Sequence, residues 1–312
     1  MKSLRLGTRG SKLALWQAEH VAKELRKSHP DLKVELQIIK TTGDKIIDVA
    51  LSKIGDKGLF TKEIEKELLE GRIDLAVHSM KDLPTQLEKG LCVGAVLQRE
   101  NPADVLISHQ DYTFENLPIE ARIGTSSLRR IAQLKKLRPD LVFVEIRGNV
   151  ETRIRKMHEE NLNGIILAYA GVKRLGMENV ITQVLSYETI LPAVGQGIIA
   201  IEARQEDTKV LSLLQKINDK SAYLSSQAER AFLRELEGGC QVPIASLAEV
   251  KDDRISMRGL IASLDGSEII QGRDEGSCLE AELLGQKLAR SLLDQGGARV
   301  LGDIRQAGGQ DG

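Results

Sequence analysis

The chain has 312 residues, of which 41% are hydrophobic and 29% charged, and its formal net charge is -1. This length predicts two or three domains with ample core volume. The near-neutral balance argues against a general nucleic-acid-binding surface, and an aromatic content of 3% leaves little for base stacking. No apolar run is long enough to span a bilayer, and no signal core follows Met1. We therefore expect a soluble, cytoplasmic protein that contacts neither membrane nor nucleic acid.

The cysteines and histidines predict no metal site. Cys92, Cys240 and Cys278 are far apart and form no C-x-x-C pattern, and the five histidines are scattered. Three unpaired cysteines fit a reducing compartment.

The first 100 residues alternate between strand and helix patterns, which predicts a mostly parallel sheet with right-handed crossovers. Residues 40–58 carry three glycines without clean periodicity and predict a mobile loop. The predicted elements are strand 4–8, helix 12–28, strand 34–39, helix 60–70 and strand 73–77.

The segment His78–Pro84 directly follows a predicted buried strand. In sheets of this kind ligands bind at the carboxyl ends of the strands, so the polar side chains of this segment are expected to face that crevice. Asp82 beside Lys81 fits either a ligand-facing carboxylate or a solvated ion pair, and position alone favours neither.

The segment 122–130 repeats the arrangement of residues 4–12, in which a strand leads through glycine and hydroxyl residues into a helix. Helix N-termini present unpaired N–H groups, so both turns are predicted anion sites. Residues 121–156 hold ten Lys or Arg against three acids, a difference of +7. Many of these cations fit a solvated face. Arg129, Arg130 and Arg147, however, begin helices, where a cation opposes the helix dipole. We interpret them as a carboxylate or phosphate cradle.

The remainder of the chain predicts two further strands, a glycine-punctuated crossing and a small separate domain. No Walker or G-x-G-x-x-G pattern appears, so a nucleotide site lacks its motif. The tail from Gln306 is rich in Gly, Gln and Asp and predicts disorder. The predicted segments are strands 141–146 and 164–169, crossing 191–197, strand 198–203, a helix ending near Leu236, sheet segments 242–250, 254–263 and 267–272, and helix 279–294.

Cys240 follows a helix that stops at Gly238-Gly239, and Pro243 prevents the helix from resuming. The thiol is therefore placed on a tight turn of small residues, where a large group could reach it. A lone cysteine before Val-Pro-Ile is by itself more typical of a small buried apolar residue.

Five motifs in this order resemble the porphobilinogen deaminase family over nearly the full length. They are His78–Asp82 (HSMKD), Gly124–Arg130 (GTSSLRR), Arg147–Val150 (RGNV), Leu191–Gly197 (LPAVGQG) and Glu237–Cys240 (EGGC), with Thr8–Leu15 (TRGSKLAL) before them.

The resemblance implies an α/β fold with two periplasmic-binding-protein-like (type II) lobes of mixed, mainly parallel sheets and a small α+β third domain. It implies domain 1 at 1–98 and 198–217, domain 2 at 99–197, and domain 3 at 218–312 with a three-stranded antiparallel sheet. The two lobes would face a cleft, and a monomer is implied.

The resemblance also implies a transferase, hydroxymethylbilane synthase. A dipyrromethane cofactor would be held by a thioether to Cys240. Four porphobilinogen units would be added with loss of ammonia, and linear hydroxymethylbilane would be released by hydrolysis and handed to uroporphyrinogen-III synthase in heme and tetrapyrrole biosynthesis. Asp82 would stabilise cationic intermediates as the catalytic carboxylate, and Lys53, Lys57 and Phe60 would belong to a lid loop. The implied carboxylate-binding residues are Arg9, Ser11, Lys81, Thr125, Ser126, Ser127, Arg129, Arg130, Arg147, Arg153, Arg174 and Gln196.

Arginine-rich turns fit this chemistry, because each pyrrole brings two carboxylates and planar guanidinium groups bind carboxylates in a bidentate way. Two alternatives remain. A two-lobed binding module for a small polycarboxylate anion would share the turns, but it normally needs export and gives no reason for the Gly-Gly-Cys segment. A nucleic-acid-binding protein could use the basic stretch, although neutrality and scarce aromatics oppose it.

Overall fold

A computed structural model describes residues 3–45, 61–238 and 242–309. Contacts divide the chain into two compact units. The first unit is Met1–Glu100 with Gly197–Ser226, and the second is Asn101–Gln196 with Gln227–Gly312.

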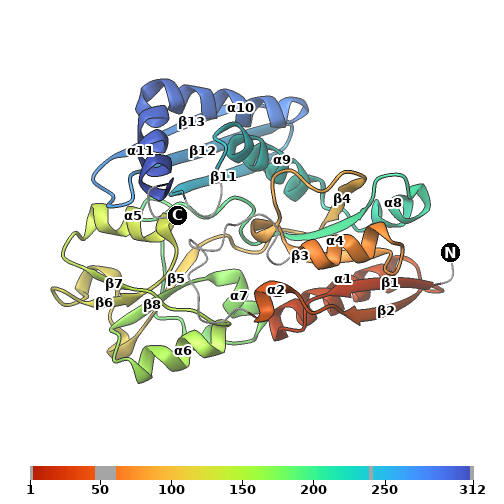
Figure 1. Cartoon of the computed structure of the whole chain (residues 1–312), viewed down its shortest axis with the longest axis horizontal. Helices are drawn as coiled ribbons and strands as arrows, with labels where there is room; N and C mark the ends of the chain where they lie inside the picture. The colour runs from red at the N-terminus through yellow and green to blue at the C-terminus, as the bar shows by residue number, and fades with distance from the viewer. Residues whose placement is uncertain (1–2, 46–60, 239–241, 310–312) are drawn as a thin grey trace. The chain divides into compact units, whose positions relative to one another are not determined.

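The first unit is built on a five-stranded sheet (Figure 1). Its strands are β1 (Ser3–Thr8), β2 (Lys33–Ile38), β3 (Leu75–Ser79), β4 (Leu91–Val96) and β10 (Ile199–Arg204). They lie in the order β2-β1-β3-β10-β4. β1 is parallel to β2 and β3, whereas β10 is antiparallel to both β3 and β4. The chain thus returns to this sheet late and inserts a reversed strand between two earlier ones.

Helices cover both faces of this sheet. α1 (Lys12–Ser28) and α8 (Thr208–Leu214) share a core with Leu75 and Val77 of β3, whereas α4 (Lys62–Leu69) packs with Ala76. Successive side chains of a strand point to opposite faces, so His78 lies on the same face as Ala76, towards α4. The short helix α2 (Thr42–Lys45) precedes residue 46.

The second unit holds a five-stranded sheet of the same pattern. Its order is β7-β6-β8-β5-β9, where β6 is parallel to β7 and β8, and β5 is the reversed strand. The strands are β5 (Asp104–Ser108), β6 (Arg122–Gly124), β7 (Val142–Val144), β8 (Gly164–Ala168) and β9 (Gln183–Val184), and the helices are α5 (Leu128–Leu137), α6 (Val150–Glu159) and α7 (Tyr169–Arg174), with short 3-10 turns at His109–Asp111, Phe114–Asn116 and Glu178–Val180.

A three-stranded antiparallel sheet completes the second unit (Figure 1). Gly285 lets two of its helices approach closely, because a Cβ there would lie 2.1 Å from the Ala228 carbonyl oxygen. The elements are α9 (Lys220–Glu235), which begins in the first unit, β11 (Ile244–Lys251), β12 (Arg254–Ala262), β13 (Ile269–Ser277), a 3-10 turn Cys278–Glu280, α10 (Ala281–Leu292), a π-helical turn Leu293–Gly297 and α11 (Ala298–Gly309).

The predicted fold class, mixed α/β with mainly parallel sheets and a small antiparallel sheet, is confirmed, with one reversed strand in each large sheet. Each predicted domain holds one sheet, but contacts place the second and third sheets in one unit, and the domain limits stay a prediction. The prediction of a disordered tail from Gln306 is wrong up to Gly309. Buried Val300 and Leu301 anchor α11, and Arg305 Nη2 donates to the Leu236 carbonyl at 2.9 Å. Composition alone missed this tertiary support.

Candidate active site

A pocket of the first unit lies where two neighbouring strands end. β1 leads into α1, and β3 leads into the 3-10 helix η1 (Met80–Asp82). Because β1 and β3 are parallel neighbours, the two turns meet at the carboxyl edge of the sheet. The pocket is lined by Arg9, Ser11, Leu13, Ala14, Gln17, Thr61, Val77, His78, Ser79 and Asp82.

Ser11 begins α1 as its N-cap, and its Oγ accepts the Ala14 N–H at 3.3 Å. The first turn of the helix therefore opens beside the pocket, where its unpaired N–H groups favour anions. The half-buried Arg9 adds a guanidinium to the same wall. The sequence predicted both residues as carboxylate ligands, and the structure brings them into one pocket with Asp82.

Asp82 is the exposed carboxylate of this pocket. Its side chain makes no hydrogen bond or ion pair with any residue that the structure describes. The alternative interpretation, a solvated ion pair with the exposed Lys81, is therefore not formed within the described part of the chain. Both oxygens of Asp82 are left to a ligand.

The inner wall of the pocket combines His78 and Ser79, from the segment 78–84 that was expected to face the crevice, with Gln17, which the sequence did not single out. The amide of Gln17, on the buried side of α1, donates to Ser79 Oγ at 2.9 Å. The imidazole Nε2 of His78 lies 3.1 Å from Oε2 of the fully buried Glu202. A glutamine within the apolar stripe of the first helix was the signal in the sequence for the α1 side of this wall.

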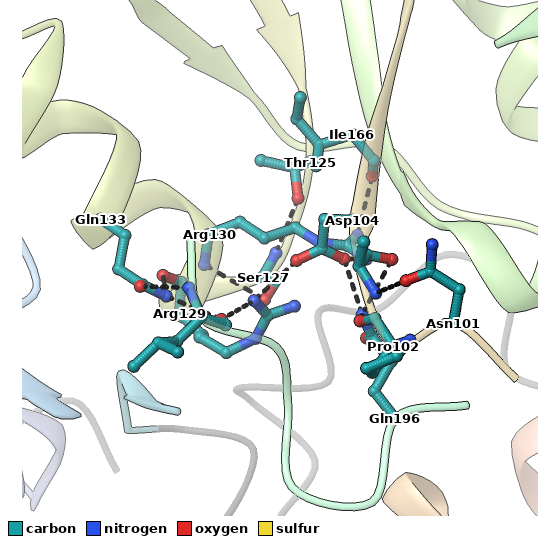
Figure 2. Close-up of polar contacts among 12 residues, drawn as sticks. Asn101, Pro102, Asp104, Thr125, Ser127, Arg129, Arg130, Gln133, Ile166 and Gln196 are labelled. Carbon is teal, nitrogen blue, oxygen red and sulfur yellow. Dashed lines mark hydrogen bonds and ion pairs between the residues drawn. The ribbon is translucent and has the colours of Figure 1, made fainter. Parts of the chain in front are cut away.

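In the second unit, Arg129 and Arg130 converge on one buried carboxylate (Figure 2). Arg129 Nη1 donates to Asp104 at 2.7 Å, and Arg130 donates to it from Nε at 3.1 Å and Nη2 at 2.6 Å. Burial by itself would raise the pKa of Asp104, but the charges and hydrogen bonds of the two arginines hold it well below its usual range. The countercharge for these cations is thus first a protein carboxylate, which the sequence analysis missed.

This cluster has two cations for one anion, and all three side chains are buried. Arg129 Nη1 and Arg130 Nη1 also donate to the carbonyls of Leu191 and Ile166. Among the described residues, no acceptor receives the Nε or Nη2 protons of Arg129. That edge of the guanidinium is available to one more carboxylate.

Gln196 joins the same cluster. Its Nε2 donates to the Pro102 carbonyl at 2.7 Å and to Asp104 Oδ1 at 3.0 Å (Figure 2). Gln133 holds the other end of the 191–196 segment, because it accepts from Leu191 N–H at 2.8 Å and donates to the Leu191 carbonyl at 3.1 Å. The predicted motif 191–197 is therefore fixed at both ends to the arginine cluster.

The predicted hydroxyl residues build the turn before α5. Ser127 caps the helix by accepting Arg130 N–H at 3.5 Å, and the buried Thr125 accepts Ser127 N–H at 3.3 Å. Ser126 Oγ donates to the Ile146 carbonyl at 2.8 Å and accepts its N–H at 3.1 Å. These hydroxyls have local partners, so their first role is to shape the turn.

The remaining predicted arginines lie at helix ends of the second unit. Arg147 Nε donates to Glu145 at 3.1 Å just before α6, and Arg153 Nε donates to the Gly148 carbonyl at 2.8 Å within its first turn. Arg174 is the buried last residue of α7. Cys240, Lys53, Lys57 and Phe60 lie outside the described residues, as does most of the predicted loop 40–58.

The described residues contain neither a metal-binding cluster nor a membrane-spanning helix. No group of three or more His, Cys, Asp or Glu side chains there has an arrangement that could hold a metal ion. Nor does any described helix have the length and apolarity that crossing a membrane requires.

Comparisons with known proteins cover nearly the whole chain. Residues 4–212 match the family model "Porphobilinogen deaminase, dipyromethane cofactor binding domain", and residues 223–294 match "Porphobilinogen deaminase, C-terminal domain". A porphobilinogen deaminase of Syntrophomonas wolfei is 65% identical over 98% of this chain and 100% of its own length, and one of Carboxydothermus hydrogenoformans is 54% identical over 98% of each. A solved structure of a probable amino-acid ABC transporter extracellular-binding protein from Bacillus subtilis aligns with 70% of this chain and 90% of its own, at 12% identity and a TM-score of 0.41. The two family models and the relatives at this identity establish that the chain belongs to the porphobilinogen deaminase family.

Proposed function

We propose that Asp82 is the catalytic carboxylate of this porphobilinogen deaminase, a transferase that condenses four porphobilinogen molecules, with loss of ammonia, into hydroxymethylbilane. The observation that carries the proposal is an exposed carboxylate in a pocket, with no partner among the described residues and with cationic and hydroxyl groups on the same wall. The alternative of a solute-binding module is set aside because both matched family models belong to the deaminase.

Departure of ammonia from porphobilinogen leaves positive charge on the pyrrole system. A carboxylate aimed at the pyrrole N–H stabilises that charge as it develops, and its fixed position avoids the cost of reorganising solvent. Asp82 is suited to this role because its oxygens are not engaged by other described residues. Arg9 and Ser11, with the open N-terminus of α1, would bind the acetate or propionate of the same pyrrole.

The residues of the second unit also fit a polycarboxylate group. The cluster of Arg129, Arg130 and Asp104 is buried with one cation in excess, and a buried charge without a partner is costly. A carboxylate on the Nε and Nη2 edge of Arg129 would complete it. The further proposed carboxylate-binding residues are Lys81, Thr125, Ser126, Ser127, Arg147, Arg153, Arg174 and Gln196.

The family's dipyrromethane cofactor, when bound, supplies the pyrrole to which the first substrate unit is joined. Cys240 is the proposed attachment residue, and a thioether there would resist hydrolysis while the product leaves. The proposed lid comprises Lys53, Lys57 and Phe60, which would close over the elongating chain. The protein is proposed to act as a cytoplasmic monomer and to pass its product to uroporphyrinogen-III synthase.

Asp82→Asn tests the catalytic assignment, because the amide keeps the size of the side chain but not its charge. Loss of one well-placed electrostatic group typically lowers kcat about 100- to 1000-fold. Asp31→Asn, the same change at an exposed aspartate of the first unit, is the matched control and is expected to keep normal turnover. Turnover of Asp82→Asn close to that of the control would rule the assignment out.

The anchor is tested separately by the intact mass of the wild type and of Cys240→Ser. The wild type should carry a surplus equal to two condensed porphobilinogen units, and the serine variant should not. A serine variant that keeps the surplus would place the attachment elsewhere.

A further inference from the structure

Behind the pocket lies a buried group of two carboxyl side chains and one imidazole, all on the α4 face of the first sheet. His78 projects from β3 and Glu202 from the neighbouring β10, and Glu65 lies on α4, which covers that face. Relative exposures are 6% for His78, 0% for Glu202 and 7% for Glu65. Nothing proposed above uses this group, although His78 also lines the pocket with Asp82.

The contact with Glu202 indicates which nitrogen of the His78 ring carries the proton. Nε2 lies 3.1 Å from Glu202 Oε2, so the proton of the ring is held on this nitrogen by a carboxylate. Glu202 does not line the pocket, whereas His78 does. His78 therefore links a buried carboxylate to the pocket wall, and its second nitrogen, Nδ1, makes no hydrogen bond to any described residue. This is how a carboxylate orients a histidine base and stabilises its cation.

The surrounding charges favour such a base. Burial, with the charge of Glu202, raises the pKa of Glu65, so Glu65 takes up a proton more readily than an exposed glutamate. One oxygen of Glu202 and one of Glu65 have no hydrogen-bond partner among the described residues. Among the described residues neither carboxyl is paired with a lysine or arginine, so an imidazolium at His78 would be the countercharge of Glu202. Several charged or titratable groups surround the His78 imidazole. They are Glu202 on β10, Glu65 on α4, Cys92 on β4, Glu88 in the loop before β4, and Arg9 and Asp82 in the pocket.

The reaction requires a proton acceptor at each addition. The C–N bond of the protonated aminomethyl group breaks with its electron pair going to nitrogen, which leaves as ammonia. The aminomethyl carbon then bonds to a pyrrole carbon that still carries hydrogen. That C–H bond breaks, its electrons return to the ring, and one proton must leave. Asp82 stabilises the cation best while it stays ionised, so a separate base is useful.

We propose that His78, oriented by Glu202, is a second proton-transfer residue of the pocket and accepts the proton lost from the pyrrole carbon. The proton passes to Nδ1, the imidazolium is stabilised by Glu202, and the proton then leaves with ammonia, as ammonium, or through solvent. This inference rests on the proposed function of the pocket.

The test is the pH dependence of kcat for the holoenzyme and three variants. His78→Gln keeps an amide N–H for Glu202 but cannot titrate, and Glu202→Gln keeps the shape of the acceptor but removes its charge. Glu35→Gln makes the same chemical change at an exposed position of β2 in the same sheet and is the control. Circular dichroism and intact mass establish that each variant is folded and loaded.

His78→Gln is expected to lower the kcat plateau about 100-fold, the usual contribution of a general base, and to abolish the limb of the profile that reports imidazole. Glu202→Gln is expected to move the acid limb to lower pH, because removing a nearby anion makes an imidazolium easier to deprotonate. The control should match the wild type.

A His78→Gln profile that matches the wild type in plateau and limb would overturn the proposal. If His78→Gln does not fold, the Glu202→Gln profile decides alone, and an unmoved limb refutes the proposal. Failure of the proposed function of the pocket would give a different result. In that case Asp82→Asn would show normal turnover, whatever the effect of His78→Gln.

Discussion

Replacement of Asp104 by asparagine should destabilise the second unit strongly. The carboxylate is 0% exposed and accepts four hydrogen bonds, three from guanidinium groups and one from Gln196. Asparagine keeps the shape but leaves Arg129 and Arg130 buried beside each other without an anion. Breaking a buried pair in this way costs about 3–5 kcal/mol, because the remaining charge is uncompensated.

Urea unfolding followed by circular dichroism measures this loss as a lower transition midpoint. Glu275→Gln is the control, since Glu275 accepts from Arg254 at 2.7 Å in a solvent-exposed pair of the same unit. Exposed pairs contribute little, so the control midpoint should hardly move. Equal midpoints for the two variants would refute the argument that burial makes the Asp104 cluster stabilising.

The pH dependence of Asp104→Asn provides a second check. The folded-state pKa of Asp104 is depressed, so its stabilisation is present above the unfolded-state value of about 4 and declines as pH falls below it. The difference in unfolding free energy between the wild type and Asp104→Asn should therefore be constant above about pH 5 and become smaller in more acid solution. A gap that widens with acidification would contradict the sign of this shift.

Two further perturbations concern packing and a buried carboxyl. Gly285→Ala would place a methyl group 2.1 Å from the Ala228 carbonyl oxygen, so α9 and α10 must separate, and the unfolding free energy should fall by about 1–3 kcal/mol in thermal or urea unfolding. Gly302→Ala, which meets no atom within 4 Å, is its control. Because folding raises the pKa of Glu65, its contribution to stability is full below the unfolded-state value of about 4 and declines as pH rises through the folded value. Glu65→Gln should remove that decline, so the melting temperature of the variant should rise relative to that of the wild type as pH increases towards 8. Melting temperatures that differ by the same amount at every pH would contradict the raised pKa of Glu65.

Local signals in the sequence were enough to place the pocket. The strand that leads through Arg9 and Ser11 into a helix predicted an anion site, and the segment after the buried strand 73–77 was expected to face the crevice at the strand ends. The structure brings these two turns together in one pocket. Both signals depend on residues close in the chain, where hydrophobic periodicity and capping act.

The partners of buried charges could not be predicted in this way. Asp104 lies 25 residues before Arg129, and Glu202 lies 124 residues after His78, and no local pattern links such pairs. Arg129 and Arg130 lie in the first turn of a helix, where the sequence analysis expected them to bind a ligand. The nearest anion is instead Asp104, on strand β5. The third strand of the antiparallel sheet also extends to Ser277, beyond the predicted 272, because its charged end Arg273–Glu275 pairs with β12 without an apolar pattern.

The reversed strand β10 has a consequence for synthesis on the ribosome. All five strands of the second sheet lie within residues 104–184, so that sheet can form as soon as this stretch has emerged. The first sheet needs Ile199–Arg204 between β3 and β4, although both of those strands are made about a hundred residues earlier. Until then each keeps an unpaired apolar edge, and such edges are prone to aggregation. The nascent chain should therefore complete its middle third before its beginning, with β3 and β4 as the strands that most need protection in the interval.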